Sequence, residues 1–399
     1  MAGRMFTEAG IGAAQGVLQR HVDQGTVPGA VGLIDRGGET HVFAVGTKAV
    51  DGDDPMRPDT IFRLTSMTKP VTAVAVMMLL EEGKLRLDEP VDRLLPELAD
   101  RRVLRVLDGE LDDAVPADRP ITVEDLLSFR CGLGLILAPP DTYPIQRAIA
   151  ARNLAGFDAP DPTVAYGPDE WLGQLGELPL MAQPGADWLY TAGSNLQGVL
   201  VARAAGQPLS HFFAERIFAP LGMADTGFFV PADKADRFVP AYTVAPDGLV
   251  LYDDAVDGAW NHAPRFEAGD AGLVGTAGDF LAFTRIVMGE QGSGATRLLS
   301  PESVAAMQMD RLTEAQRTGG YPILAPGTGW GYGMSVVVDA GAAGRPEGSI
   351  GWTGGFGTSW IGDPTSGLTI ILLTQRMFTD PVLPVIHREF QDAAFNAMR

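Results

Sequence analysis

Residues 71–80, VTAVAVMMLL, place apolar side chains on every face of a helix. A surface helix keeps a polar stripe, whereas a helix that is apolar all round is buried. We predict that this helix begins near Met67 or Thr68, with Pro70 in its first turn, where a missing N–H costs little. Gly83 is the residue expected to end it. A buried helix needs a substantial core around it, and 46% of the chain is apolar.

Strand patterns lie at the two ends of the chain. Two β-rich runs around a Gly-Gly turn predict a hairpin at residues 30–38 and 39–47. Four more β-rich runs, separated by short turns, predict adjacent antiparallel strands at 331–339, 348–354, 357–364 and 368–375. Terminal helices are predicted at 7–22 and 382–398. We therefore predict an α/β (α+β) fold with one antiparallel sheet, flanked by helices and built from both chain ends.

The middle of the chain differs from the two ends. Short helical segments alternate with loops rich in Pro, Gly and Asp, and they include a capped helix and an amphipathic helix at residues 121–129 and 194–206. We interpret residues 88–269 as a mostly helical domain inserted into an α/β domain made of residues 1–87 and 270–399. The active site is expected in the cleft between the two domains.

Composition argues against several classes of function. The formal net charge of −20 argues against nucleic acid and anionic membranes as partners, and no apolar run reaches the roughly 18 residues of a membrane span. The single cysteine, Cys131, excludes an internal disulfide, and the five histidines show no metal-ligand spacing. We expect no metal and no organic cofactor. No basic region followed by an apolar segment opens the chain, so we predict a cytoplasmic protein; its oligomeric state stays open.

Lys69 lies three residues after Ser66, at the entrance to the apolar helix. Side chains at i and i+3 share one face of a helix, so the amine and the hydroxyl are expected to meet. The positive end of the helix dipole and the apolar surroundings both disfavour a charged ammonium ion. A neutral amine can take the serine proton, which makes Ser66 a candidate nucleophile and Lys69 its base. The alternative is a chance pair, which would usually lie on a surface.

Five segments, spread over nearly the whole chain, carry the motifs that matter here. They are TSMTKP followed by the helix and GKLRLDEPV, PGADWLYTAGSN, PLGMADTGF, GLVGTAGDFLAF and GSIGWTGGFGTSWIGDP. Together they resemble the serine β-lactamase and penicillin-recognising superfamily, and within it most closely the family VIII carboxylesterases, which share the class C β-lactamase fold. The resemblance implies a β-lactamase/transpeptidase-like fold and an enzyme that works through an acyl-serine intermediate.

The resemblance implies two further parts of the site. Tyr190, in the second motif, would work with Lys69 and move a proton between the nucleophile and the leaving group, because a hydroxyl both accepts and donates. A core tyrosine is the alternative. The oxyanion hole would use the backbone N–H groups of Ser66 and Gly355. Gly354 and Gly355 together suit a close backbone approach to the substrate, or alternatively a β-bulge.

Departures from the family pattern bear on the substrate. Where β-lactamases usually have KTG, this chain has Trp352, Thr353 and Gly354. An indole offers a flat apolar wall in place of an ammonium group that attracts a carboxylate. The alternative is that Trp352 is a buried strand residue. Ala192 stands where an asparagine usually bonds the substrate amide. Both departures favour a neutral ester over a lactam or a peptide.

Three other residues are predicted near the substrate. Phe356 and Cys131 are expected to contribute to the binding site together with the third motif, although the Cys131 thiol is expected to be packed and inert rather than nucleophilic. Arg376, after the last strand, could supply the missing cation, and an acidic substrate would then return to contention.

We predict a serine carboxylesterase that cleaves small-molecule esters through an acyl-enzyme on Ser66, with Lys69 and Tyr190 as general base and acid. A β-lactamase, a D-aminopeptidase-like amidase and an acyltransferase on the same scaffold are the alternatives. A non-catalytic binding protein is disfavoured because all three residues are intact.

Overall fold

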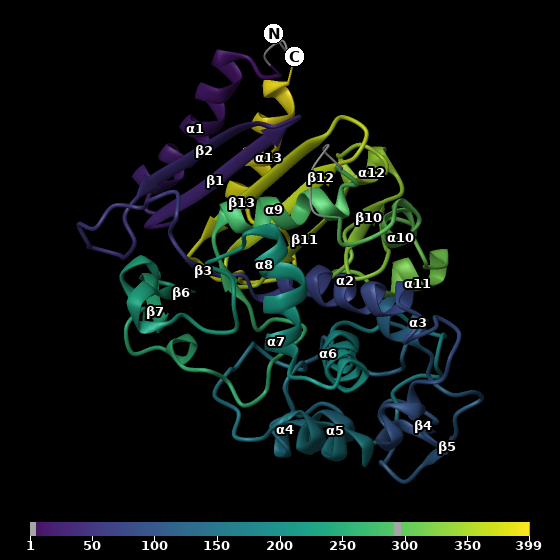
Figure 1. The fold of residues 1–399 in the computed structure, drawn as a ribbon. Helices are drawn as coiled ribbons and strands as arrows, with labels where there is room; N and C mark the ends of the chain where they lie inside the picture. Colours follow the sequence, from purple (N-terminus) through teal and green to yellow (C-terminus); the bar gives the residue numbers. More distant parts are fainter. Residues whose placement is uncertain (1–4, 291–296, 399) are drawn as a thin grey trace.

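The computed structural model describes residues 5–290 and 297–398. Its centre is a seven-stranded sheet with the strand order β2-β1-β13-β12-β11-β10-β9 (Figure 1). All neighbouring strands in it are antiparallel. The strands are β1 (Gly29–Arg36), β2 (Glu39–Gly46), β9 (Thr328–Trp330), β10 (Ser335–Val337), β11 (Ile350–Gly354), β12 (Thr358–Asp363) and β13 (Leu368–Thr374). Because β1 pairs with β13, both chain ends build one sheet, as predicted.

Helices surround the sheet and fill the middle of the chain. They are α1 (Glu8–Asp23), α2 (Thr68–Glu81), α3 (Val123–Leu127), α4 (Pro144–Ala151), α5 (Pro168–Gly176), α6 (Ala192–Ala205), α7 (Leu209–Phe213), α8 (Ala219–Leu221), α9 (Ala277–Val287), α10 (Pro301–Met307), α11 (Glu314–Gly319), α12 (Ala340–Ala343) and α13 (Val385–Ala397). Three two-stranded pairs complete the fold: β3 (Phe62–Arg63) with β8 (Val274–Gly275), β4 (Arg102–Leu104) with β5 (Ala114–Pro116), and β6 (Ala241–Ala245) with β7 (Gly248–Asp253). Over residues 5–290 and 297–398, the helices are too short or too polar to cross a bilayer.

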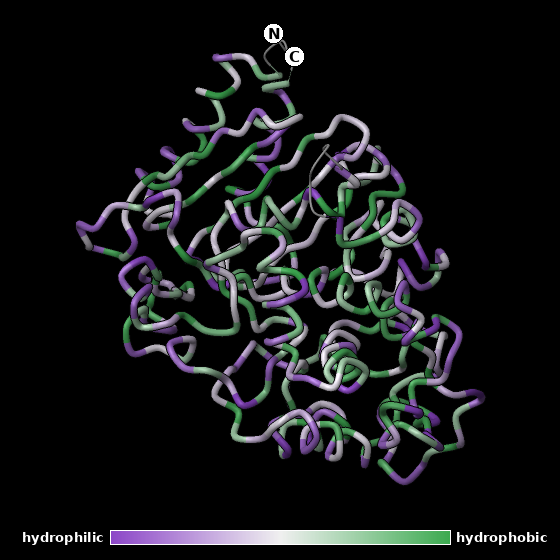
Figure 2. Tube along the Cα trace, in the orientation of Figure 1, coloured by the Kyte–Doolittle hydropathy of each residue, from purple (hydrophilic) through white to green (hydrophobic). Residues whose placement is uncertain are grey.

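Alternation along the central strands produces two apolar layers. Ala30 and Ile34 of β1 pack with α1 and α13 on one face of the sheet. Val31 and Leu33, the residues between them, pack into the larger core with α2 and α9 on the other face. This is the period of two expected of a strand that is buried on both sides. Figure 2 shows the hydrophobic residues concentrated along these central strands.

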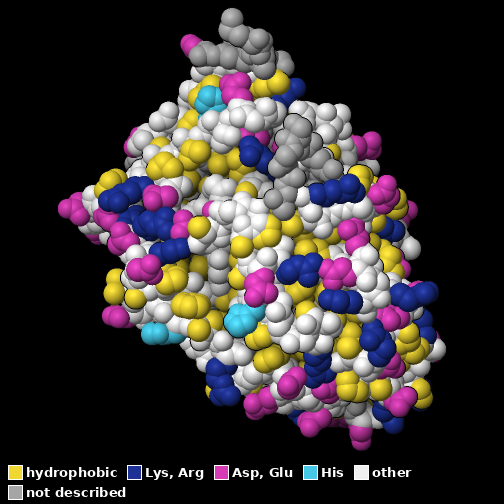
Figure 3. All heavy atoms as spheres, in the orientation of Figure 1, with side chains coloured by type: hydrophobic (Ala, Val, Ile, Leu, Met, Phe, Trp, Pro, Cys, Tyr) yellow, Lys and Arg dark blue, Asp and Glu magenta, His cyan; other side chains and the backbone are white. Residues whose placement is uncertain are grey.

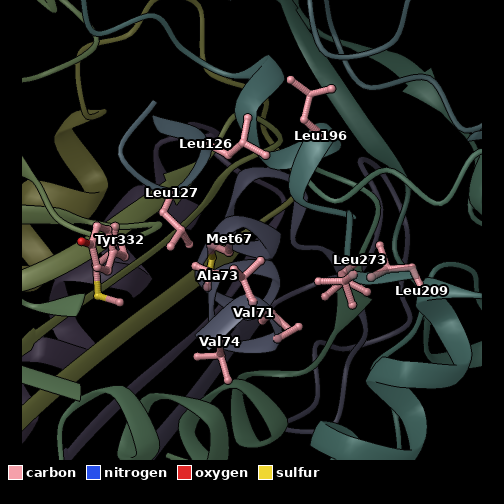
Figure 4. Packing of buried hydrophobic residues seen from close by; sticks show 14 of the residues in the cluster. Met67, Val71, Ala73, Val74, Leu126, Leu127, Leu196, Leu209, Leu273 and Tyr332 are labelled. Atoms are coloured by element: carbon pink, nitrogen blue, oxygen red, sulfur yellow. The ribbon is translucent and has the colours of Figure 1, made fainter. Parts of the chain in front are cut away.

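Helix α2 is enclosed as the sequence predicted. It begins at Thr68 with Pro70 in its first turn, every residue from Thr68 to Leu79 is buried, and Gly83 follows its end with φ +69°. Figure 4 shows its side chains surrounded by residues of other elements, among them Leu126 and Leu127 of α3, Leu196 of α6, Leu209 of α7, Leu273 and Tyr332. Helix α2 therefore lies between the sheet and the helices α3, α6 and α7, which are in the lower half of Figure 1.

Two predicted elements differ in the structure. Only β10 forms within the strand predicted at 331–339, because the chain turns at Gly333, where φ is +81°; β9, which pairs with β10, ends just before the predicted range. A Cβ at Gly333 would lie 2.4 Å from the Ala73 Cβ, so only glycine lets this turn approach α2. Helix α6 is not amphipathic, since its residues from Ala192 to Val201 are all buried between α2 and α3.

The middle of the chain, residues 88–269, contains α3 to α8 and the strand pairs β4–β5 and β6–β7. Its helical character agrees with the sequence, while the division of the chain into two domains stays a prediction. On the face shown in Figure 3, acidic and basic side chains are interspersed, and no continuous basic patch forms there.

Candidate active site

Ser66 lies in the 3₁₀ turn Thr65–Met67, directly before α2. Thr65 has φ +43°, a left-handed conformation that is unusual for a β-branched residue and is held only where neighbouring contacts fix it. Those contacts come from two sides. The Leu64 carbonyl accepts a hydrogen bond from the Thr358 hydroxyl at 3.1 Å. The Leu64 N–H donates to the Leu273 carbonyl at 2.9 Å. The turn that carries the serine is therefore fixed to β12 and to the segment before α9.

The Lys69 side chain is fully buried and contacts Ser66. Its Nζ donates to the Ser66 Oγ at 2.9 Å and to the backbone carbonyl of Asp270 at 2.9 Å. The same Nζ lies 4.4 Å from the centre of the Tyr190 ring. The structure thus brings the three predicted catalytic side chains together around one amine.

Tyr190 comes from the segment before α6 and stands among aromatic rings. Its ring contacts those of Phe129, Trp188 and Trp352, at centroid distances of 5.9, 5.8 and 5.5 Å. The Trp352 indole donates its N–H to the Tyr190 hydroxyl oxygen at 2.9 Å. This corrects the interpretation of Trp352 as only an apolar wall. The indole holds the phenol in place, and it leaves the hydroxyl proton and a second lone pair for other partners.

Gly354 lets β11 approach the serine turn closely. A Cβ at this position would lie within 2.5 Å of the Leu64 carbonyl oxygen, the Thr358 Oγ1 and the Thr65 Oγ1. This glycine therefore makes a close approach to the serine turn and to Thr358, while the predicted approach to a substrate stays a prediction. At Gly355, by contrast, an added Cβ would meet nothing within 4 Å, and the residue is exposed.

The peptide units before Ser66 and Gly355 have defined directions. The Gly354 carbonyl accepts from the Gly357 N–H at 3.0 Å, inside the turn. In a trans peptide the N–H points opposite to the carbonyl, so the Gly355 N–H points out of this turn. The Thr65 carbonyl likewise accepts from the N–H of Thr68, which directs the Ser66 N–H away from the helix.

The remaining predicted site residues fall in different places. Trp352 is 8% exposed, and Thr353 beside it is half-buried. These two residues line the end of a groove of about 530 Å³, whose other lining residues include Ile323, Val337 and Val382. Its lining also includes the charged residues Arg345, Arg388 and Asp392, while Ser66, Lys69 and Tyr190 are not among the residues that line it.

Three other residues were predicted to lie near the substrate, and the structure gives that placement no support. Phe356 is buried in a cluster with Ile61, Val230 and Trp260, and Cys131 lies in the main core with no exposed surface. Burial raises the pKa of the Cys131 thiol to about 12, as expected for an inert thiol. The Arg376 guanidinium is directed to the Thr26 carbonyl, at 3.5 Å, rather than to the site.

One residue at the site, Asp270, was not predicted from the sequence. Its carbonyl binds Lys69, its N–H donates to the Asn195 Oδ1 at 3.1 Å, and its Oδ2 accepts from the Thr191 hydroxyl at 3.4 Å. Burial raises the pKa of its carboxyl, while the charge of Lys69 opposes that rise. An aspartate two residues before the first residue of the apolar motif GLVGTAGDFLAF was the available signal. Asn195, which follows Ala192 in the second motif, thus faces Asp270.

Metal chemistry has no candidate ligand set in the part of the chain that the structure describes. Within residues 5–290 and 297–398, no three side chains of His, Cys, Asp or Glu are grouped so that they could hold a metal ion.

Comparison with known protein families gives a match over most of the chain. The sequence model of the family described as Beta-lactamase matches residues 14–393. The chain belongs to this family. The superfamily resemblance and the β-lactamase/transpeptidase-like fold are thereby confirmed, and the chain is a β-lactamase-fold member of a serine hydrolase family.

Similar proteins include an esterase and a hydrolase with promiscuous acyltransferase activity. Protein Rv1367c of Mycobacterium tuberculosis is 36% identical over 373 residues, which cover 90% of this chain and 89% of that protein. Esterase EstB of Burkholderia gladioli is 32% identical over 370 residues, 88% of this chain and 86% of that one. The solved structure of EstCE1, described as a hydrolase with promiscuous acyltransferase activity, superposes with a TM-score of 0.81 at 28% identity and covers 97% of this chain and 99% of that chain.

Proposed function

We propose that the protein is a serine carboxylesterase. Ser66 attacks the ester carbonyl while its proton passes to the neutral Lys69 amine, and the N–H groups of Ser66 and Gly355 donate to the oxyanion. The Tyr190 hydroxyl donates a proton to the departing alcohol and is reprotonated by Lys69. Water then attacks the acyl-enzyme, giving up its proton along the same route, and releases the acid and Ser66.

The observation that carries this proposal is the 2.9 Å contact between the Lys69 amine and the Ser66 Oγ at the start of a buried helix. When the amine is uncharged, the same contact runs in reverse, with the hydroxyl donating to Nζ. A general base must lie within hydrogen-bond reach of the proton that it removes, and this distance meets that requirement.

Two features of the site favour an ester over a β-lactam or a peptide. Trp352 takes the place of the lysine that attracts the antibiotic's carboxylate, and its polar atom is engaged with Tyr190. Asn195, the amide closest in sequence to the missing one at Ala192, bonds the Asp270 N–H instead. EstB, described as an esterase, is consistent with this assignment.

A direct comparison of substrates tests the proposal. We expect kcat/KM for p-nitrophenyl butyrate to exceed that for nitrocefin, and Ser66→Ala to lower the esterase value by at least about 10³-fold. Ser210→Ala, on α7, is a control that removes a hydroxyl from a different pocket. A higher kcat/KM for nitrocefin, or full activity of Ser66→Ala, would refute the carboxylesterase assignment.

Acyl transfer to an alcohol is a second candidate. EstCE1 is described as a hydrolase with promiscuous acyltransferase activity, and an acyl-serine intermediate can pass its acyl group to an alcohol in place of water. Product analysis in water containing a small alcohol separates the two activities. Ester formation that outpaces hydrolysis would favour the transferase, and acid alone would favour the esterase.

A further inference from the structure

Asp270 contacts the lysine of the candidate site through its backbone carbonyl, and its carboxyl group is buried behind that contact. Asp270 is 6% exposed, and its backbone carbonyl accepts the Lys69 Nζ–H at 2.9 Å. Its side chain is oriented by the hydroxyl of Thr191, the residue that follows Tyr190. A carboxylate is rarely buried without a partner of opposite charge, because desolvation disfavours its ionised form.

Few other charged groups reach this carboxyl. From α2 the ionisable side chain is Lys69, from the segment before α6 it is Tyr190, and α6 itself contributes the neutral Asn195. The small cavity behind Asp270 has one further charged lining residue, Asp161, which is exposed and bonds to Thr163. Lys69 is therefore the cation that acts on the Asp270 carboxyl.

We propose that Asp270 is a positioning residue that compensates the charge which Lys69 acquires when it accepts the Ser66 proton. This rests on the proposed function. In the step, the Ser66 O–H bond breaks, its proton forms a new bond to Nζ, and the serine oxygen bonds the carbonyl carbon. The positive charge on Nζ is then balanced by the buried carboxylate, and it disappears when the proton returns to the leaving alcohol by way of Tyr190.

This role explains how a dry site tolerates an ammonium ion. Lys69 is completely buried, so water does not stabilise its charged form. The charge of Lys69 acts on the Asp270 carboxyl, and an opposite charge at about 4–6 Å favours the charged form by the equivalent of about one to three pH units. Removing the carboxylate should therefore make the amine give up its proton at lower pH, and it should also make the amine a weaker base.

Asp270→Asn is the decisive variant, because it keeps the shape and removes the charge. We expect the acid limb of the kcat/KM profile for p-nitrophenyl butyrate to move to lower pH by about one unit or more, and the plateau to fall by about tenfold or more. Thr191→Val, which removes only the hydroxyl that donates to the carboxylate, should shift the limb in the same direction by a smaller amount.

Thr72→Val is the matched control. The Thr72 hydroxyl donates to the Gly269 carbonyl at 2.6 Å, so it anchors the same segment to α2 without a charge. If Asp270 only holds this segment in place, Asp270→Asn should behave like Thr72→Val, with lower activity and an unmoved acid limb.

Each result bears on one proposal alone. If the pH dependence of kcat/KM for Asp270→Asn has the same shape as that of the wild type and differs only in height, the proposed role of Asp270 is wrong. The proposed esterase activity is unaffected by that result. If Asp270→Asn fails to fold, the limb of Thr191→Val decides in the same way. Full activity of Ser66→Ala would instead overturn the proposed function.

Discussion

The glycine at position 354 gives a quantitative test of how the site is assembled. In Gly354→Ala the new Cβ would start within 2.5 Å of three oxygen atoms, whereas real Cβ atoms essentially never come closer than 3.0 Å to such neighbours. Two of the three oxygens belong to the serine turn, at Leu64 and Thr65. Strand β11 and that turn must therefore separate by about 0.5–1 Å, and the Gly355 N–H moves away from Ser66 with the strand.

The expected cost follows from that displacement. Overpacking of this kind lowers the free energy of unfolding by about 1–3 kcal/mol, and a displacement near 1 Å of a catalytic group can lower the rate by about 10²-fold. Activity should be measured as kcat/KM for p-nitrophenyl butyrate, and stability by urea denaturation of the same preparations.

Gly16→Ala is the control for this substitution. An added Cβ at Gly16, in α1, would meet nothing within 4 Å, so this variant should keep its activity and gain about 0.5–1 kcal/mol of stability. If Gly354→Ala also kept wild-type kcat/KM and stability, the close approach of β11 to the serine turn would be wrong.

Three further predictions concern the surroundings of the site. Trp352→Phe keeps an aromatic ring but loses the N–H that binds Tyr190; we expect kcat/KM to fall by about 3–10-fold, and an unchanged value would show that this bond is dispensable. Burial lowers the pKa of His387 from 6.5 to about 3, so the unfolded chain binds a proton that the folded protein does not as the pH falls below 6.5; the free energy of unfolding should decrease from pH 6.5 toward 3, and His387→Gln should flatten that slope. The Cys131 thiol should resist iodoacetamide at pH 8 in the native protein and react once urea unfolds it; rapid native labelling without loss of structure would contradict its burial.

Features that depend on short stretches of sequence could be predicted well. The buried helix, the serine and the lysine lie within one segment, so their mutual placement follows from helical geometry alone. The hairpin β1–β2 and the strands β11 to β13 follow from β-rich runs bounded by turns. Strand β9 was not predicted, and β10 is shorter than the predicted strand, because the sequence alone does not show the tight packing of Gly333 on α2.

Features that depend on distant segments could not be predicted in the same way. Trp352 and Tyr190 are 162 residues apart, so nothing local indicates that the indole N–H points at the phenol. Lys69 and Asp270 are 201 residues apart. The burial of Phe356 and Cys131 likewise depends on which elements pack over them, and a motif position does not contain that information.

The central claim is that Ser66 carries the acyl group during turnover. Acid quenching during hydrolysis of p-nitrophenyl butyrate, followed by intact-mass analysis and peptide mapping, tests it most directly. We predict a mass increase equal to one butyryl group, located on the peptide that contains Ser66 and absent from Ser66→Ala. An acyl group on another residue, or rapid turnover with no covalent adduct under conditions in which deacylation is slowed, would contradict the account.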